Sequence, residues 1–341
     1  MQRKGINYDT GFTRAGAQSS RQSFDHAQVR RELEIIARDL HCNAVRISGE
    51  DPQRIALAAR HALDAGLEVW FAPFPSDMTT DELVPYFAEH ARLAEDLRKE
   101  SPWVVFVLGC EMSLFNRGFV PGATYMERIQ TMMNPALSAV ISESPETMLQ
   151  RFNAFLQRAV AMVREQFAGP ITYASGTWED VDWSAFDIVG VDHYKDASNQ
   201  RVYREQLRPY FAHGRPVAVT EFGCCTYRGA GDRGAMGWAI VDRSTQPPRL
   251  TEDVVRDEQV QSNYLTDVLD MLDEEGVDSA FWFTFASYGY PFSTNPRHDL
   301  DCASYGLVKI LDGASGETYP GMPWEPKQAF YRLAECYARR D

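Results

Sequence analysis

The chain has 341 residues, of which 44% are hydrophobic, so it is long enough to bury one large core or two modest ones. Its formal net charge is −14 and it has no run of lysine and arginine, which argues against nucleic acid or an anionic membrane surface as a partner. No apolar stretch approaches the roughly 20 residues of a transmembrane helix, and the N-terminus lacks the apolar segment of a signal peptide, so the sequence predicts a cytoplasmic protein with no membrane partner.

Strand-like and helix-like patterns alternate along nearly the whole chain. Short β-branched and apolar runs predict strands at residues 4–8, 43–48, 67–74, 104–109, 171–175, 187–191, 217–221 and 279–285. Apolar residues at helical spacing predict helices at about residues 24–41, 52–65, 80–100, 145–167, 199–213, 254–275 and 326–339. Ser23 and Asp51 are the expected N-caps of the first two helices, and a short or irregular helix is expected after the fifth strand.

Eight strands separated by helices predict an α/β fold, a single (β/α)8 TIM barrel that occupies residues 1–341 as one catalytic domain. No internal repeat, low-complexity tract or interdomain linker interrupts the pattern. Long connections follow strands four, seven and eight, at residues 112–143, 224–252 and 286–325. We therefore expect them at the C-terminal face of the barrel, where such folds hold their active sites.

Two glutamates mark strand ends: Glu111 follows strand four and Glu221 ends strand seven. Those strands lie on roughly opposite sides of the barrel, so the two carboxyl groups are expected to face each other across its mouth. Such a pair can cleave a glycosidic bond, because one group protonates the departing oxygen while the other attacks the anomeric carbon or activates water. The structural alternative is that each carboxylate only pairs with a buried arginine or caps a loop.

On these residues the chain resembles clan A of the glycoside hydrolases, whose (β/α)8 barrels carry catalytic glutamates after strands four and seven. The segment Thr220-Glu221-Phe222-Gly223 is similar to the strand-seven signature of cellulase-like and mannanase-like members. The resemblance implies retaining hydrolysis of a β-linked sugar or oligosaccharide. It gives Glu111 the role of acid/base and Glu221 that of nucleophile, without a cofactor.

Other strand ends extend the resemblance. Arg46 matches a family arginine beside the nucleophile, and Tyr194 matches a tyrosine that donates to it. Trp282 on strand eight matches an aromatic platform for the sugar, and we expect His193 and Trp178 to line the same substrate-binding site. Each residue also has a purely structural interpretation, as a buried ion pair, a packing residue at the barrel rim or a core aromatic.

Cys110 stands just before Glu111, where most clan members have an asparagine that hydrogen-bonds the sugar 2-hydroxyl. We place Cys110 at the substrate-binding site, but a thiol is a weak donor and acceptor. This departure favours, as an alternative, a barrel that binds carbohydrate without cleaving it. Cys110 as a nucleophile paired with His193 is a weaker hypothesis.

A metal-dependent barrel hydrolase is disfavoured, because the six cysteines and seven histidines show no metal-ligand spacing. We therefore predict no metal site. Three further acidic residues, Asp77, Glu179 and Asp180, follow strands three and five at the same face, and most of them are expected to be solvated.

Overall fold

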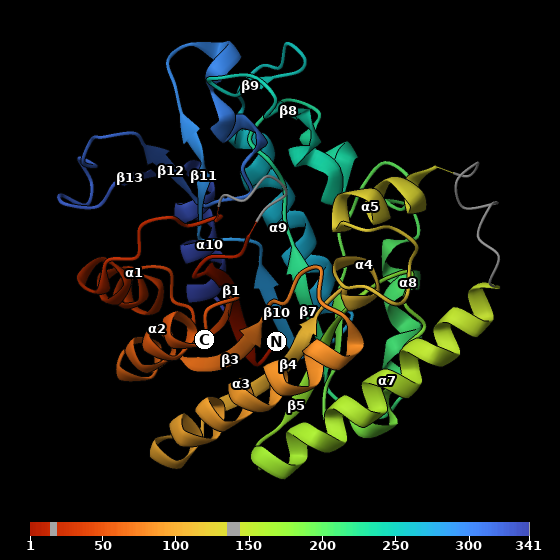
Figure 1. The fold of residues 1–341 in the computed structure, drawn as a ribbon. Helices are drawn as coiled ribbons and strands as arrows, with labels where there is room; N and C mark the ends of the chain where they lie inside the picture. Colours follow the sequence, from red (N-terminus) through yellow and green to blue (C-terminus); the bar gives the residue numbers. More distant parts are fainter. Residues whose placement is uncertain (14–18, 135–143, 341) are drawn as a thin grey trace.

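In the computed structural model, which describes residues 1–13, 19–134 and 144–340, eight parallel strands close into a barrel (Figure 1). The barrel strands are β1 (Arg3–Asp9), β2 (Ala44–Gly49), β3 (Glu68–Pro73), β4 (Val104–Cys110), β5 (Ile171–Gly176), β6 (Val189–Asp192), β7 (Val217–Phe222) and β10 (Ser279–Trp282). Each is paired in parallel with the next, and β10 returns to β1. The predicted (β/α)8 barrel is therefore confirmed.

Helices surround the barrel strands (Figure 1). They are α1 (His26–Arg38), α2 (Pro52–Asp64), α3 (Thr80–Glu100), α7 (Pro145–Gln166), α8 (Tyr203–Phe211), α9 (Glu258–Glu274) and α10 (Gln328–Ala338), with the short η1 (Trp183–Ala185) after β5. Asp51 caps α2 as predicted, since its side chain accepts from the Gln53 amide. The cap of α1 is Asp25 rather than Ser23, because the Asp25 carboxylate accepts the Gln28 amide.

The three long connections contain small elements of their own. They are α4 (Met112–Phe115) and α5 (Tyr125–Met133) after β4; η2 (Ala230–Ile240), β8 (Val241–Asp242) and β9 (Arg249–Leu250) after β7; and β11 (Ala286–Phe292), η3 (Pro296–His298), η4 (Leu300–Ala303), β12 (Val308–Leu311) and β13 (Trp324–Pro326) after β10. Residues 135–143 of the first connection lie outside the described residues. The two small sheets, β8–β9 and β11–β12–β13, lie in the upper part of Figure 1.

Two apolar layers hold the barrel together. The interior layer consists almost entirely of residues on the barrel strands or directly beside them, and the rings of Trp70 and Phe281 meet there with centroids 4.6 Å apart. The outer layer packs the other face of each strand against the helices, as Val219 and Leu265 illustrate. Because side chains alternate along a strand, a residue's place in the register decides which layer it enters. Among the described residues, no helix is long and apolar enough to cross a membrane.

Candidate active site

An extra residue in β7 turns Glu221 toward the inside of the barrel. Alternation from Ala218, an interior residue, would send Glu221 outward with Val219. Instead, β6 pairs Val191 with Val219 and then Asp192 with Glu221, so Thr220 is left without an opposite residue. The pairing with β10 shifts in the same place. This bulge reverses the alternation, and the carboxylate enters the mouth.

Glu221 is held by two donors from neighbouring strands. The Arg46 guanidinium on β2 donates to Glu221 Oε1 at 2.6 Å, and the Tyr194 hydroxyl after β6 donates to Oε2 at 3.0 Å. Arg46 is buried and also donates to Asn7 Oδ1 at 2.9 Å, while Asn7 itself donates to the Thr220 carbonyl at 3.0 Å. Burial raises the pKa of the Tyr194 phenol well above its ordinary value, so it remains a donor. Both oxygens thus receive the contacts that an ionised carboxylate accepts.

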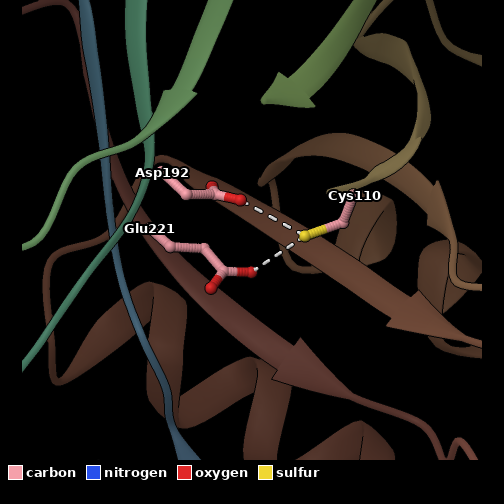
Figure 2. Close-up of side chains that lie close together, drawn as sticks. All are labelled: Cys110, Asp192 and Glu221. Carbon is pink, nitrogen blue, oxygen red and sulfur yellow. Dashed lines mark hydrogen bonds between the residues drawn. The ribbon is translucent and has the colours of Figure 1, made fainter. Parts of the chain in front are cut away.

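The Cys110 thiol points toward two neighbouring carboxyl groups, those of Asp192 and Glu221 (Figure 2). Its Sγ lies 3.3 Å from Asp192 Oδ2 and 3.5 Å from Glu221 Oε1, so its single hydrogen can be donated to either carboxyl group. Burial and the charges of these two groups raise the pKa of the thiol well above its usual range, so it stays protonated. Asp192 Oδ1 accepts the Thr220 hydroxyl at 2.7 Å, and burial together with Glu221 raises the pKa of Asp192 as well.

Glu111 leaves β4 through a strained turn. The pairing of β4 with β5 skips a residue between Val107 and Cys110, and Gly109 there has a φ of 79°. Glu111 itself is left-handed, with φ 42° and ψ 44°. Among the described residues, none hydrogen-bonds to its carboxyl group. Burial, then the charges of Asp192 and Glu221, raise its pKa well above the ordinary value for a glutamate.

Of the three remaining predicted residues, Trp178 reaches the rim of the barrel, whereas His193 and Trp282 do not. Trp178, after β5, is 38% exposed, and its indole donates to Ser113 Oγ at 3.2 Å beside the Glu111 turn. His193 faces outward, where its ring stacks on Tyr203, and burial lowers its pKa to about 4. It does not contact Cys110, so the structure gives the cysteine–histidine hypothesis no pair.

Trp282 is also turned away from the mouth. It is 0% exposed and lies in the outer layer, where its indole donates to the Tyr305 carbonyl and its ring meets Phe222 edge-on. The interior residue of this strand is its neighbour, Phe281. An aromatic ring with no exposed surface offers nothing for a sugar to stack on, so Trp282 is not part of the site that we describe.

Sequence reasoning missed three polar residues. Asp192 lies near Glu221 at the Cys110 thiol, Asn7 contacts Arg46 and the Thr220 carbonyl, and Glu179 is 4% exposed, although most of the acidic residues in its group were expected to be solvated. Asp192 and Asn7 each lie at a predicted strand end or inside a strand, where a polar residue is a signal of an inward-facing group. Glu179 had no such signal, because it lies in the loop after β5 and not on a strand. Only the folding of this loop against the outer side of the barrel strands buries it.

Cys110, Asp192 and Glu221 are a group among the described residues whose ligand atoms lie within 4.8 Å of one another, close enough to hold a metal ion. The chemistry of the group fits a metal poorly. Arg46 already binds Glu221 Oε1 and places a positive charge beside it, and the thiol must lose a proton that its surroundings retain.

Solved structures with a similar barrel include several glycosidases. A GH113 β-1,4-mannanase matches over 100% of both chains, with a TM-score of 0.63 and 15% identity. The GH113 β-mannanase AaManA from Alicyclobacillus acidocaldarius matches 100% of this chain and 98% of its own, with a TM-score of 0.62 and 16% identity. These mannanases and this chain share the closed eight-stranded (β/α)8 barrel fold.

A β-glucuronidase from Ruminococcus gnavus shares the fold over 99% of this chain and 49% of its own, with a TM-score of 0.58 and 14% identity. No sequence family and no curated protein matches the chain. At these identities the likeness establishes a common fold, and the chemistry has to be argued from the residues at the mouth.

Proposed function

We propose that this protein is a retaining glycoside hydrolase that cleaves a β-linked sugar or oligosaccharide. The observation that carries the proposal is the contrast between two carboxyl groups. Glu221 receives donors from Arg46 and Tyr194, which suit the ionised form. Burial and nearby negative charge raise the pKa of Glu111, which suits the protonated form. A carboxylate bound by two donors and a second carboxyl group that retains its proton can supply a nucleophile and an acid.

The proposed reaction has two displacements. Glu221 attacks the anomeric carbon, the bond to the glycosidic oxygen breaks, and Glu111 gives its proton to that oxygen. The products of this step are the free leaving group and a glycosyl ester on Glu221. Glu111, now a carboxylate, takes a proton from water, whose oxygen attacks the same carbon and releases Glu221. No metal or organic cofactor enters either step.

The charges at the mouth favour a neutral sugar as the substrate. Three carboxyl groups, those of Glu111, Asp192 and Glu221, influence one another there, and the guanidinium of Arg46 is already bound to Glu221. A uronate would bring a further negative charge into this group. We therefore propose a neutral β-linked substrate and would begin with β-1,4-mannan. Cys110 donates its single hydrogen to either carboxyl group, so another residue would have to bind the 2-hydroxyl.

The test uses 2,4-dinitrophenyl β-glycosides. Glu221→Gln should lower kcat at least about a thousandfold, because no covalent intermediate forms. Glu111→Ala should be slow in water, and sodium azide should restore turnover with formation of the β-glycosyl azide, since the azide anion needs no general base. Full activity of Glu221→Gln, in protein with the circular dichroism of the wild type, would end the proposal.

A second candidate is a barrel that binds carbohydrate without cleaving it. The observation that favours it is the buried Asp192 beside Glu221, since two carboxyl groups this close do not readily ionise together and a nucleophile must be ionised. This candidate predicts saturable binding of manno-oligosaccharides by calorimetry without products in the same sample. Binding should then persist unchanged in Glu111→Ala.

A further inference from the structure

Behind the barrel wall, Glu179 binds the backbone that carries Glu111. Its Oε1 accepts the Ser113 amide at 3.0 Å, and its Oε2 accepts the Gly176 amide at 2.9 Å. Oε2 also accepts the hydroxyl of Tyr173 at 2.8 Å. That hydroxyl in turn accepts the Met112 amide at 2.7 Å. The two amides that follow Glu111 are thus bound by one carboxylate and the tyrosine attached to it.

These bonds replace the usual cap of α4. A residue at the start of a helix commonly turns its own side chain back to accept an amide of the first turn. Glu111 occupies that position before Met112 but makes no such bond. Because Glu179 and Tyr173 take the amides instead, the carboxyl group of Glu111 remains available to the mouth.

The same hydrogen bonds help to hold Glu111 in a strained backbone conformation. A left-handed conformation is unfavourable for a residue with a Cβ atom, and it persists where surrounding contacts enforce it. Glu111 has this conformation, and its own amide is fixed to the Ala174 carbonyl at 2.8 Å. Contacts on both sides of Glu111, from β5 and from Glu179, therefore define the direction of its side chain.

Glu179 also contributes charge. The groups that act on Glu111 are Asp192, Glu221 and Glu179, which raise its pKa, and Arg46, which lowers it, in addition to the larger effect of burial. Burial raises the pKa of Glu179 itself to about 7, and its hydrogen-bond donors act in the opposite direction. A carboxylate that accepts two amides and a hydroxyl is best satisfied in its ionised form.

We propose that Glu179 is a positioning residue for the acid/base: with Tyr173, it fixes Glu111 at the mouth and adds a negative charge that keeps Glu111 protonated. This inference rests on the proposed function, in which Glu111 protonates the leaving group. The loop that carries Glu179 also reaches the rim of the barrel. Trp178 precedes Glu179 and donates to Ser113 Oγ, and an added Cβ at Gly176 would lie 2.5 Å from the Trp178 ring. One loop therefore places the acid and an exposed aromatic together.

The test compares leaving groups that need a proton with one that does not. Glu179→Gln should lower kcat/KM for a phenyl β-glycoside at least about tenfold. It should leave the 2,4-dinitrophenyl β-glycoside within about twofold, because that leaving group departs without protonation. Loss of the charge should also move the alkaline limb of the kcat/KM profile to lower pH, since Glu111 then releases its proton more readily.

Tyr173→Phe is the second variant, in case Glu179→Gln does not fold. It removes the acceptor of the Met112 amide and keeps the carboxylate, so it should lower the phenyl glycoside rate without moving the alkaline limb to lower pH. Asp180→Asn is the matched control, since Asp180 is the exposed next residue and its side chain holds no part of this network. Its leaving-group ratio should equal that of the wild type.

The outcomes separate the two claims. If the wild type hydrolyses both glycosides and Glu221→Gln does not, the proposed function stands. Equal leaving-group ratios and equal pH profiles in the wild type, Glu179→Gln and Tyr173→Phe would then overturn the positioning role of Glu179. If the wild type hydrolyses neither glycoside, nor any other β-glycoside offered, the proposed function fails and this inference fails with it.

Discussion

The proposed nucleophile depends on its contact with Arg46, and Arg46→Met removes that contact while keeping an unbranched side chain. The Arg46 side chain is 1% exposed and the Glu221 side chain 12% exposed, with the bonded atoms 2.6 Å apart. Opposite charges centred about 4 Å apart attract by about 4 kcal/mol at an effective dielectric of about 20. Removal of the cation also leaves Glu221 next to Asp192 without a counter-charge, and it leaves the side-chain Oδ1 of Asn7 without its donor. We expect Arg46→Met to lower the free energy of unfolding by about 3 kcal/mol.

Urea unfolding near pH 7 of the wild type, Arg46→Met, Glu221→Gln and the double variant forms a thermodynamic cycle. Removing one partner leaves a buried charge without its counter-charge, whereas removing both does not, so the double variant should be more stable than Arg46→Met. We expect a coupling free energy of about 2 kcal/mol. Arg60→Met is the control, because the Arg60–Glu100 pair is 52% and 57% exposed and should contribute less than about 1 kcal/mol. Additive single effects at Arg46 and Glu221 would refute the electrostatic reasoning.

Three further predictions concern the same mouth. The pKa of Asp192 is raised, so its folded form retains a proton that the unfolded chain loses above about pH 4, and stability is lost as pH rises toward the folded pKa. Asp192→Asn should therefore raise the melting temperature at about pH 8 and give no gain at about pH 3; an equal gain at both values would contradict this. Iodoacetamide should leave the activity intact at about pH 8, because the buried thiol of Cys110 stays protonated, and rapid inactivation with alkylated Cys110 in the peptide map would disprove it. Trp178→Ala should raise KM about tenfold on a manno-oligosaccharide with little change in kcat, and an unchanged KM would remove Trp178 from the substrate site.

Most of the barrel follows from local sequence. Each strand is a short β-branched or apolar run, and a parallel crossover needs a dozen or more residues, which most of these crossovers supply as a helix and the one after β5 with only the short η1. The fourth and seventh strand ends carry Glu111 and Glu221, so strand order alone placed two carboxylates at one face. Local chemistry also fixed the start of α2, because Asp51 and Pro52 supply a cap and a fitting first residue.

The direction of the side chains was decided by the tertiary structure. A single extra residue in β7 turns Glu221 inward, and another in β4 does the same for Cys110. Register also places Phe281 inside the barrel and Trp282 outside it, which is why the expected platform is absent from the mouth. Such shifts have no signature in composition or spacing.

The sequence by itself thus determined the alternation of elements, the barrel and the two strands that end in glutamate. Only the folded chain decided that Asp192 is buried beside Glu221 and that Glu179, from a loop behind the wall, binds the amides next to Glu111. The physical reason is the separation in sequence over which each kind of interaction acts. Hydrophobic period and capping act within a few residues, whereas these contacts join residues 29 and 66 positions apart and depend on which face each strand presents after closure.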